Sequence, residues 1–344
     1  MPDLAQAPFA ALILGLAAAA AVILGGGLRM TDLADRIADR TGLGEALVGG
    51  ALLGAATSLS GVVVSLSAAM DGRASLAFSN SVGGIAAQTA FLALADLLWR
   101  KANLEHAAAE LTNLFQSALL LLLLALPVLA YGGPDMTVFA VHPVSMVLPL
   151  LYALGLIGTH RSRQAPMWQP VKTRETREDV DEEDGKDDTP TWRLFAVFGL
   201  LMAVMGLAGY AISQLAGELA DRTGISASLV GALLTAVITS LPELVTTLAA
   251  VRRGALQLAL GGIIGGNTFD TLFLTLSDIG YRDGSLYHAI GQDDLFWLGT
   301  GMAMTCILLL GQLYRQKDGP AGIGLESVAM LGLYAGAVGL AAFA

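Results

Sequence analysis

The sequence predicts an all-α membrane protein made of two related five-helix halves. Its composition, a series of long apolar segments and an internal repeat lead to this prediction. Of the 344 residues, 55% are hydrophobic and only 14% are charged, and the mean hydropathy is +0.65. Such values are typical of integral membrane proteins. Lipid offers no partners to backbone polar groups, so apolar segments of about 20 residues cross it as helices.

Ten such segments are present, five on each side of a polar linker. We expect helices at about 8–30, 43–70, 74–99, 112–131 and 138–159, and at about 192–218, 225–251, 256–279, 294–314 and 322–343. The chain then divides into a first five-helix repeat (1–159), a linker (160–191) and a second five-helix repeat (192–344). The linker is polar and acidic and is predicted to be solvated. Its acidic run at 178–185 does not fit the ligand spacing of a calcium loop.

Other features limit the classes of function and the topology. The first residues lack the positive region of a cleaved signal peptide, so the first apolar segment is expected to remain in the protein. Cys306 is the single cysteine, which excludes intrachain disulfides and thiolate metal clusters. The net charge of −10 argues against a nucleic-acid partner.

Lysine and arginine are distributed unevenly among the loops. Outside the linker, about nine lie in loops on the linker side and about three on the other side. Because basic loop residues stay in the cytoplasm, we predict a protein of a prokaryotic inner (plasma) membrane, with the linker in the cytoplasm and both termini outside.

The two halves are related in sequence at a constant spacing. Asp96 corresponds to Asp278. Three runs recur in the same register: 38–42 (ADRTG) at 220–224, 57–59 (TSL) at 239–241, and the glycine pair 83–84 at 265–266. Such regular recurrence identifies an internal repeat. With five helices in each half, the second copy enters the membrane in the opposite orientation, which is the inverted-repeat design of secondary transporters.

Two short polar runs interrupt the apolar segments of the second half: 239–243 (TSLPE) and 265–270 (GGNTFD). A charged side chain at membrane depth costs about 2.5–3.5 kcal/mol and is usually paired or functional. Pro242 has no N–H and is expected to kink or unwind its helix, which frees carbonyl oxygens, whereas the glycines allow close approach or a break. The hairpin brings these groups together with Glu243 and Asp270, so a cation is the simplest occupant.

A purely structural interpretation also fits these runs. Ser240 and Glu243 have the spacing of a capping box, Asp270 would be a hydrogen-bonded acid between helices, and the glycines would serve packing. Two acids within the membrane are a costly way to cap a helix, which favours the cation site. The four histidines are scattered along the chain and lack the spacing of metal ligands.

These two runs, in a 5+5 inverted repeat with a cytoplasmic linker, resemble the calcium/cation antiporter superfamily of sodium/calcium exchangers over nearly the whole chain. In that family one glutamate from each repeat binds calcium in the middle of the membrane. Threonine carbonyls, serine hydroxyls and an Asn or Asp complete the cation sites, and Gly266 stands where the family usually has serine. The resemblance implies a cation site in the second repeat formed by Thr239, Ser240, Glu243, Asn267 and Asp270.

The first repeat departs from the family pattern. Its matching run is 57–61 (TSLSG), so Ser60 replaces the proline, Gly61 replaces the calcium-binding glutamate, and Gln88 stands at the Asn/Asp position. Calcium is then not the only candidate substrate, because a site with fewer charged ligands also suits sodium or another monovalent ion. The neutral ligands expected from this repeat are Thr57, Ser58, Ser60 and Gln88.

The predicted function is secondary active cation antiport, in which calcium or sodium is exchanged for sodium or protons. The first and sixth helices would move against a core to expose one site to each side in turn. Burial favours the neutral form of a carboxyl group, which would let protons compete with the cation. The alternative is a degenerate homologue that no longer transports and acts as a cation sensor or membrane partner protein. No nucleophile–base pair indicates an enzyme, and the expected partners are lipid and the transported cations, without a cofactor.

Overall fold

The structure is a computed structural model that describes residues 4–41, 48–99, 101–164, 166–176, 190–319 and 322–343. Throughout these ranges the regular elements are helices, and an isolated β-bridge joins Val138 to Val141 in a loop. The all-α prediction is confirmed for this part of the chain. The acidic run of the linker, 178–185, lies outside the described residues.

The first half contains five long helices in the predicted order. They are α1 (Phe9–Thr41), α2 (Val48–Met70), α3 (Ala74–Asp96), α5 (Leu111–Gly132) and α6 (Pro143–Gln164), with the short η1 (Leu4–Gln6) before them and α4 (Leu104–Ala107) between α3 and α5. α1 and α6 continue past their predicted ends, because hydropathy marks where the apolar stretch stops and not where the helical hydrogen bonds stop. α6 therefore extends into the predicted linker.

In the second half, the two segments that carry the polar runs are broken. The first consists of α8 (Ala227–Leu229), the π-helix η2 (Val230–Thr235), α9 (Ala236–Thr239) and α10 (Leu241–Arg253), with a bend of 48° between α9 and α10. The second consists of α11 (Leu256–Asp270) and α12 (Leu272–Gly280). The remaining helices are α7 (Thr191–Thr223), the short α13 (Leu286–Ala289), α14 (Gln292–Tyr314) and α15 (Leu325–Phe343).

The breaks fall partly where the sequence predicts them. Pro242 lies in the first turn of α10, and the chain bends just before it, at Ser240. α11, in contrast, passes through Gly265 and Gly266 without interruption and ends only at Asp270. Of the two roles that the glycines allowed, a break is therefore not observed, and a Cβ atom on Gly266 would lie at ordinary contact distance, 3.4 Å, from Gln88 Oε1.

Six of the described helices are long and apolar enough to cross a bilayer: α1, α5, α6, α7, α14 and α15. The bent segment from α8 to α10 would make a seventh. The other three predicted spans correspond to α2, α3 and the α11–α12 pair, which carry many polar residues in the interior. α3 is buried over nearly its whole length.

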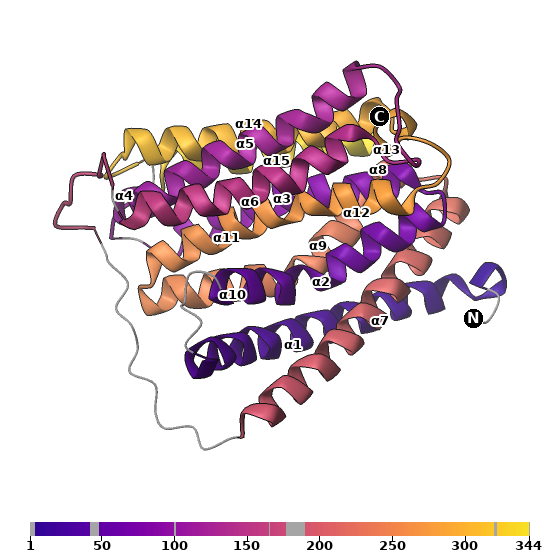
Figure 1. Cartoon of the computed structure of the whole chain (residues 1–344), viewed down its shortest axis with the longest axis horizontal. Helices are drawn as coiled ribbons and strands as arrows, with labels where there is room; N and C mark the ends of the chain where they lie inside the picture. The colour runs from indigo at the N-terminus through magenta and orange to yellow at the C-terminus, as the bar shows by residue number, and fades with distance from the viewer. Residues whose placement is uncertain are drawn as a thin grey trace.

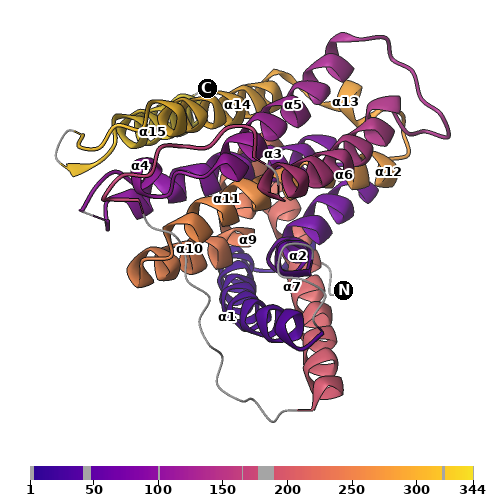
Figure 2. The same cartoon turned by 60° about the vertical axis from the view of Figure 1, so that its left-hand side comes forward.

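The helices form a layered bundle. In Figures 1 and 2, α1 and α7 run along one edge, α5, α14 and α15 lie along the opposite edge, and α2, α3 and α9–α12 lie between them. Buried apolar residues of α1 and α7, including Ile23, Met30, Met205 and Ile212, pack together in one core cluster. The marked termini lie at the opposite end of the molecule from the linker (Figure 1).

Glycines bring the α1–α7 pair into close contact with the central helices. Gly27 of α1 lies against the Pro242 ring, and Gly209 of α7 lies against the Ser60 carbonyl, so a methyl group on either glycine would overlap these atoms. Gly27 and Gly209 occupy matching positions of the sequence repeat, and so do Ser60 and Pro242. The first helix of each half therefore packs against the corresponding residue of the other half.

Asp96 and Asp278, which also match in the repeat, each accept two backbone hydrogen bonds. The donors are Leu104 and Gly324 for Asp96 (both 2.8 Å), and Leu286 and His142 for Asp278 (2.8 and 2.7 Å). In both cases one donor starts a short helix of the same half, and the other precedes the last helix of the opposite half. Hydrogen bonds to a charged acceptor contribute about 1.5–3 kcal/mol each to the stability of the fold. These carboxylates therefore stabilise the contact between the two halves.

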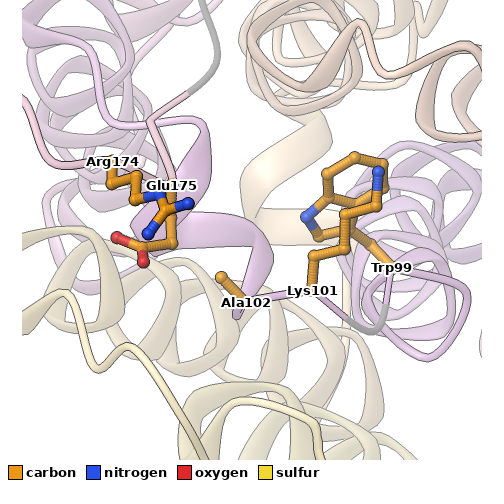
Figure 3. Close-up of a pocket in the computed structure, with 5 residues that line it drawn as sticks. All are labelled: Trp99, Lys101, Ala102, Arg174 and Glu175. Carbon is orange, nitrogen blue, oxygen red and sulfur yellow. The ribbon is translucent and has the colours of Figure 1, made fainter.

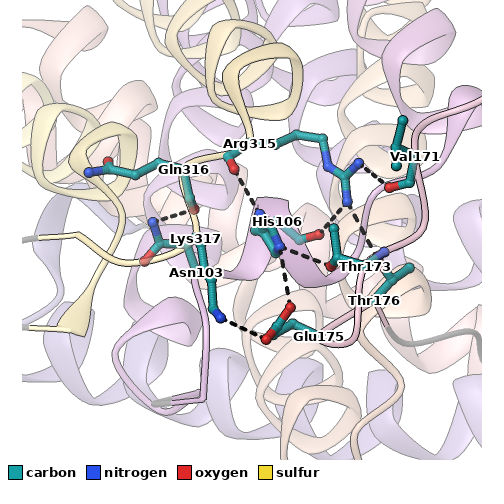
Figure 4. Close-up of polar contacts among 9 residues, drawn as sticks. All are labelled: Asn103, His106, Val171, Thr173, Glu175, Thr176, Arg315, Gln316 and Lys317. Atoms are coloured by element: carbon teal, nitrogen blue, oxygen red, sulfur yellow. Dashed lines mark hydrogen bonds and ion pairs between the residues drawn. The ribbon is translucent and has the colours of Figure 1, made fainter.

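Part of the linker is docked on the helices, although its composition predicts a solvated segment. His106 of α4 contacts the Arg315 carbonyl through Nδ1 (2.7 Å) and the Thr173 hydroxyl through Nε2 (3.0 Å). The Lys317 ammonium lies 2.8 Å from a carboxylate oxygen of Glu175 (Figure 4). This network joins the linker to α4 and to the loop between α14 and α15. His106 has no predicted role, because the histidines lack the spacing of metal ligands, and nothing near it in the sequence indicates these distant partners.

Candidate cation site

The predicted ligands all lie in the interior of the molecule. None has more than 6% of its surface exposed, and they come from α2, α3, the junction of α9 and α10, and α11. They are Thr57, Ser58, Ser60, Gln88, Thr239, Ser240, Glu243, Asn267 and Asp270.

Asp270, at the end of α11, is held by donors from the first half. Ser58 Oγ donates to Oδ1 and Gln88 Nε2 donates to Oδ2, both at 2.7 Å. Gln88 Nε2 also donates to Ser240 Oγ at 3.1 Å, and Ser81 Oγ donates to the Asp270 carbonyl at 2.8 Å. Gln88 therefore connects α3 with both broken segments, and each oxygen of the Asp270 carboxylate already has a neutral donor. Ser81 is not among the predicted ligands, because it lies in no repeat motif.

Glu243 lies directly after the bend, in the first turn of α10. The Thr57 side chain hydrogen-bonds its carboxylate, whereas Oε2 is buried without a hydrogen-bond partner. Ser240 makes no side-chain capping bond to α10, and its hydroxyl accepts from Gln88 instead. The capping-box interpretation of Ser240 is therefore wrong. The Thr239 hydroxyl donates its hydrogen to the carbonyls of Thr235 and Ala236, so its oxygen can act at the site only as an acceptor or ligand.

Four buried oxygens of the predicted ligands have no hydrogen-bond partner within the described residues: Ser60 Oγ, Gln88 Oε1, Glu243 Oε2 and Asn267 Oδ1. Leaving a buried polar atom unpaired costs about 1–3 kcal/mol, so four of them on adjacent helices require an explanation. All four are oxygens, which are the ligands that hard cations prefer. Asn267 Nδ2 donates to Thr89 Oγ1 at 3.0 Å, and this bond fixes the amide so that its oxygen stays available.

A cavity of about 410 Å³ connects Glu243 with the surface. Its walls come from α1, α10 and α11, with Gln116 of α5. Buried Glu243 and Thr57 lie at its inner end, and exposed Asp32 and Arg253 lie at its outer end. The turn between α10 and α11 is at the linker end of the molecule (Figure 1), so the cavity reaches the site from that side.

An aromatic ring fills the position of the missing glutamate. A Cβ atom on Gly61 would lie 2.7 Å from Cε2 and 3.2 Å from Cζ of Phe273, and 3.6 Å from Thr239 Oγ1. Phe273 belongs to α12 and is only 3% exposed. A larger side chain at residue 61 therefore requires Phe273 to move, and both acids of the site come from the second half. No pattern in the sequence indicated this contact, because Phe273 is one apolar residue among many.

The fold is that of the cation antiporters, as the comparison of the chain with known proteins shows, and the same comparison gives the family. The family model described as "Sodium/calcium exchanger protein" matches residues 11–159 and 193–343. These ranges include most of both halves. The chain therefore belongs to the sodium/calcium exchanger family, a family of membrane transporters, as the resemblance of its motifs predicts.

Individual relatives agree with this assignment. The chain is 27% identical over 287 residues to "Putative antiporter CaxA" of Alkalimonas amylolytica, covering 82% of this chain and 85% of that protein. A stretch of 80 residues is 36% identical to inner membrane protein YrbG of Escherichia coli (strain K12), covering 23% of this chain and 25% of that protein.

Two solved structures share the fold. The H+/Ca2+ exchanger CAX has a TM-score of 0.66 at 14% identity, with 96% of this chain and 86% of that chain covered. The sodium-calcium exchanger NCX_Mj, soaked with Na+ and Sr2+, has a TM-score of 0.58 at 19% identity, with 95% and 97% covered.

Proposed function

We propose that this protein is a secondary active antiporter that exchanges an inorganic cation for sodium or protons by alternating access. One observation carries the proposal: the buried Glu243 carboxylate has an unpaired oxygen, lies beside a helix break and faces a cavity open to the surface. The other unpaired oxygens on the neighbouring helices supply neutral ligands of the kind that hard cations bind.

The two acids of the site are compatible with sodium and with calcium. Ser58 and Gln88 are neutral donors, so their hydrogen bonds to Asp270 leave its negative charge in place, and Glu243 adds an oxygen without a hydrogen-bond partner. Two carboxylates balance one calcium ion, or one sodium ion when one of them is protonated, and calcium sites gain affinity from further carboxylates. Because the first repeat contributes no acid, sodium exchanged for protons is the leading candidate. Calcium is the second, and the structural neighbours include an H+/Ca2+ exchanger.

The proposed architecture is ten transmembrane helices in two inverted repeats, 1–159 and 192–344, joined by the linker. α1 and α7 would move together against the central helices. The matching contacts of Gly27 with Pro242 and of Gly209 with Ser60 support this division into moving and fixed parts. With the linker in the cytoplasm of a prokaryotic cell, as the loop charges predict, the open cavity corresponds to an inward-facing conformation.

Flux measurements in proteoliposomes test the proposal. Wild-type protein should take up sodium or calcium when a proton or sodium gradient is imposed. Glu243→Gln keeps the size of the side chain but removes its charge. Two unit charges 4 Å apart attract by about 4 kcal/mol at an effective dielectric constant of 20, so exchange should fall by about a hundredfold or more. Glu326→Gln is a matched control, because Glu326 is a buried glutamate at the start of α15, outside the cavity.

The outcomes separate the alternatives. A folded wild-type protein that moves no tested cation under any gradient would favour a sensor or partner protein. Exchange at the wild-type rate in Glu243→Gln would show instead that Glu243 does not bind the transported ion.

A further inference from the structure

A second cavity lies at the linker end of the molecule, away from the cation site. It has a volume of about 180 Å³ and is formed by two parts of the chain: the segment after α3 and the docked part of the linker (Figure 3). The residues that line it are Trp99, Lys101, Ala102, Arg174 and Glu175.

Positive charge predominates around this cavity. The Lys101 ammonium lies 4.8 Å from the centre of the Trp99 ring, which holds it in place through a cation–π contact. Arg174 has no ion-pair partner among the described residues. The one carboxylate in the lining, Glu175, is paired with Lys317 at 2.8 Å. Lys101 and Arg174 therefore remain available to an anion.

The Trp99 indole adds a hydrogen-bond donor. Its Nε1 atom is shielded from solvent and has no acceptor within the described residues. Figure 3 draws this nitrogen on the edge of the ring nearer Arg174 and Glu175. A buried donor without an acceptor costs about 1–3 kcal/mol, which an oxygen atom in the cavity would recover. Two cations and an N–H group around a small cavity are the donors that a phosphate group requires.

The surroundings of the cavity indicate which molecule carries the phosphate. Leu94, Leu97 and Leu98, which precede Trp99, are 40–47% exposed and form an apolar surface at the end of α3. Tryptophan is enriched at the boundary between membrane and water, where basic pockets between helices bind anionic headgroups.

We propose that this cavity binds the phosphate of an anionic phospholipid. The bound phosphate would bridge Arg174 of the linker and Lys101, and so hold the linker against α4. This proposal does not depend on which ions the protein transports, or on whether it transports any.

Native mass spectrometry of the full-length protein, titrated with phosphatidylglycerol or with phosphatidylcholine, tests the proposal. Phosphatidylglycerol should bind more tightly, and the double variant Lys101→Gln/Arg174→Gln should bind it about thirtyfold more weakly. Trp99→Phe removes the N–H donor but keeps an aromatic ring, and should also weaken binding. Arg193→Gln is the matched control, because Arg193 lies 5.7 Å from the ring of Trp192 but lines no part of this cavity, so binding should be unchanged.

Three results would overturn the proposal. One is equal affinity for the two lipids, and another is an equal loss in Arg193→Gln, which would mean a diffuse attraction to the protein surface. The third comes from a parallel titration with inorganic phosphate. Binding of phosphate without binding of phosphatidylglycerol would assign the cavity to a soluble anion and not to a lipid.

Discussion

Placing an acid at residue 61 in the first half would test whether the missing carboxylate determines the ion preference of the site. Gly61→Glu alone would put Cβ 2.7 Å from Phe273 Cε2, and such overpacking is expected to cost about 1–3 kcal/mol. Phe273→Ala removes the ring and provides space, so the informative variant combines the two substitutions. The new carboxylate would start 3.6 Å from Thr239 Oγ1, next to the bend that carries Glu243.

The expected size of the effect follows from the charges. At an effective dielectric constant of 20, an added negative charge about 4 Å from an ion attracts sodium by about 4 kcal/mol and calcium by about 8 kcal/mol. The difference of about 4 kcal/mol sets an upper limit of about a thousandfold on the gain in preference for calcium. Desolvation of the new carboxylate and its repulsion from Glu243 reduce this gain. We expect calcium to gain at least about tenfold over sodium.

The assay compares calcium and sodium uptake into proteoliposomes for wild type, for the double variant and for Gly61→Gln/Phe273→Ala. The glutamine variant fills the same space without the charge, so it separates electrostatics from packing. Equal melting temperatures of the two double variants establish that they are equally folded. An equally folded acidic variant with the same ion preference as the glutamine variant would show that residue 61 does not face the ion, and the reasoning would fail.

Three further predictions concern other parts of the molecule. Gly27→Ala should slow exchange about tenfold in the flux assay without changing equilibrium cation binding, because its methyl group would meet the Pro242 ring. Gly25→Ala is the control: its methyl group meets nothing within 4 Å, so this variant should exchange cations at the wild-type rate. Asp278→Asn removes the charge from two backbone hydrogen bonds and should lower the free energy of unfolding by about 2 kcal/mol; an unchanged melting temperature would contradict this. The Lys317 ammonium lowers the pKa of Glu175, so their ion pair persists above that pKa and is lost as the pH falls through it. Amide exchange in the docked linker, corrected for intrinsic rates, should therefore increase once the pH falls below the ordinary pKa range of a glutamate, and in Glu175→Gln it should already be fast at neutral pH.

The sequence by itself determined the helical class, the approximate position of each long helix and the break at Pro242. These features depend on local properties, namely the length of an apolar stretch and the missing N–H of proline. The repeat also identified which polar residues belong together, and all nine predicted ligands are buried. The sequence could identify these residues because a polar residue is easily recognised inside an apolar segment, and the repeat pairs such residues between the two halves.

Only the tertiary structure decided what each polar atom contacts. Gln88 donates to Asp270 although these two residues lie on helices from different halves, and Glu243 Oε2 is left without a hydrogen-bond partner. Phe273 fills the space at Gly61, and the linker packs on His106, through contacts between residues that are also far apart in sequence. Hydropathy and repeat spacing describe one segment at a time. The packing of one segment against another determines which oxygen is paired, which space is filled and from which side the cavity opens.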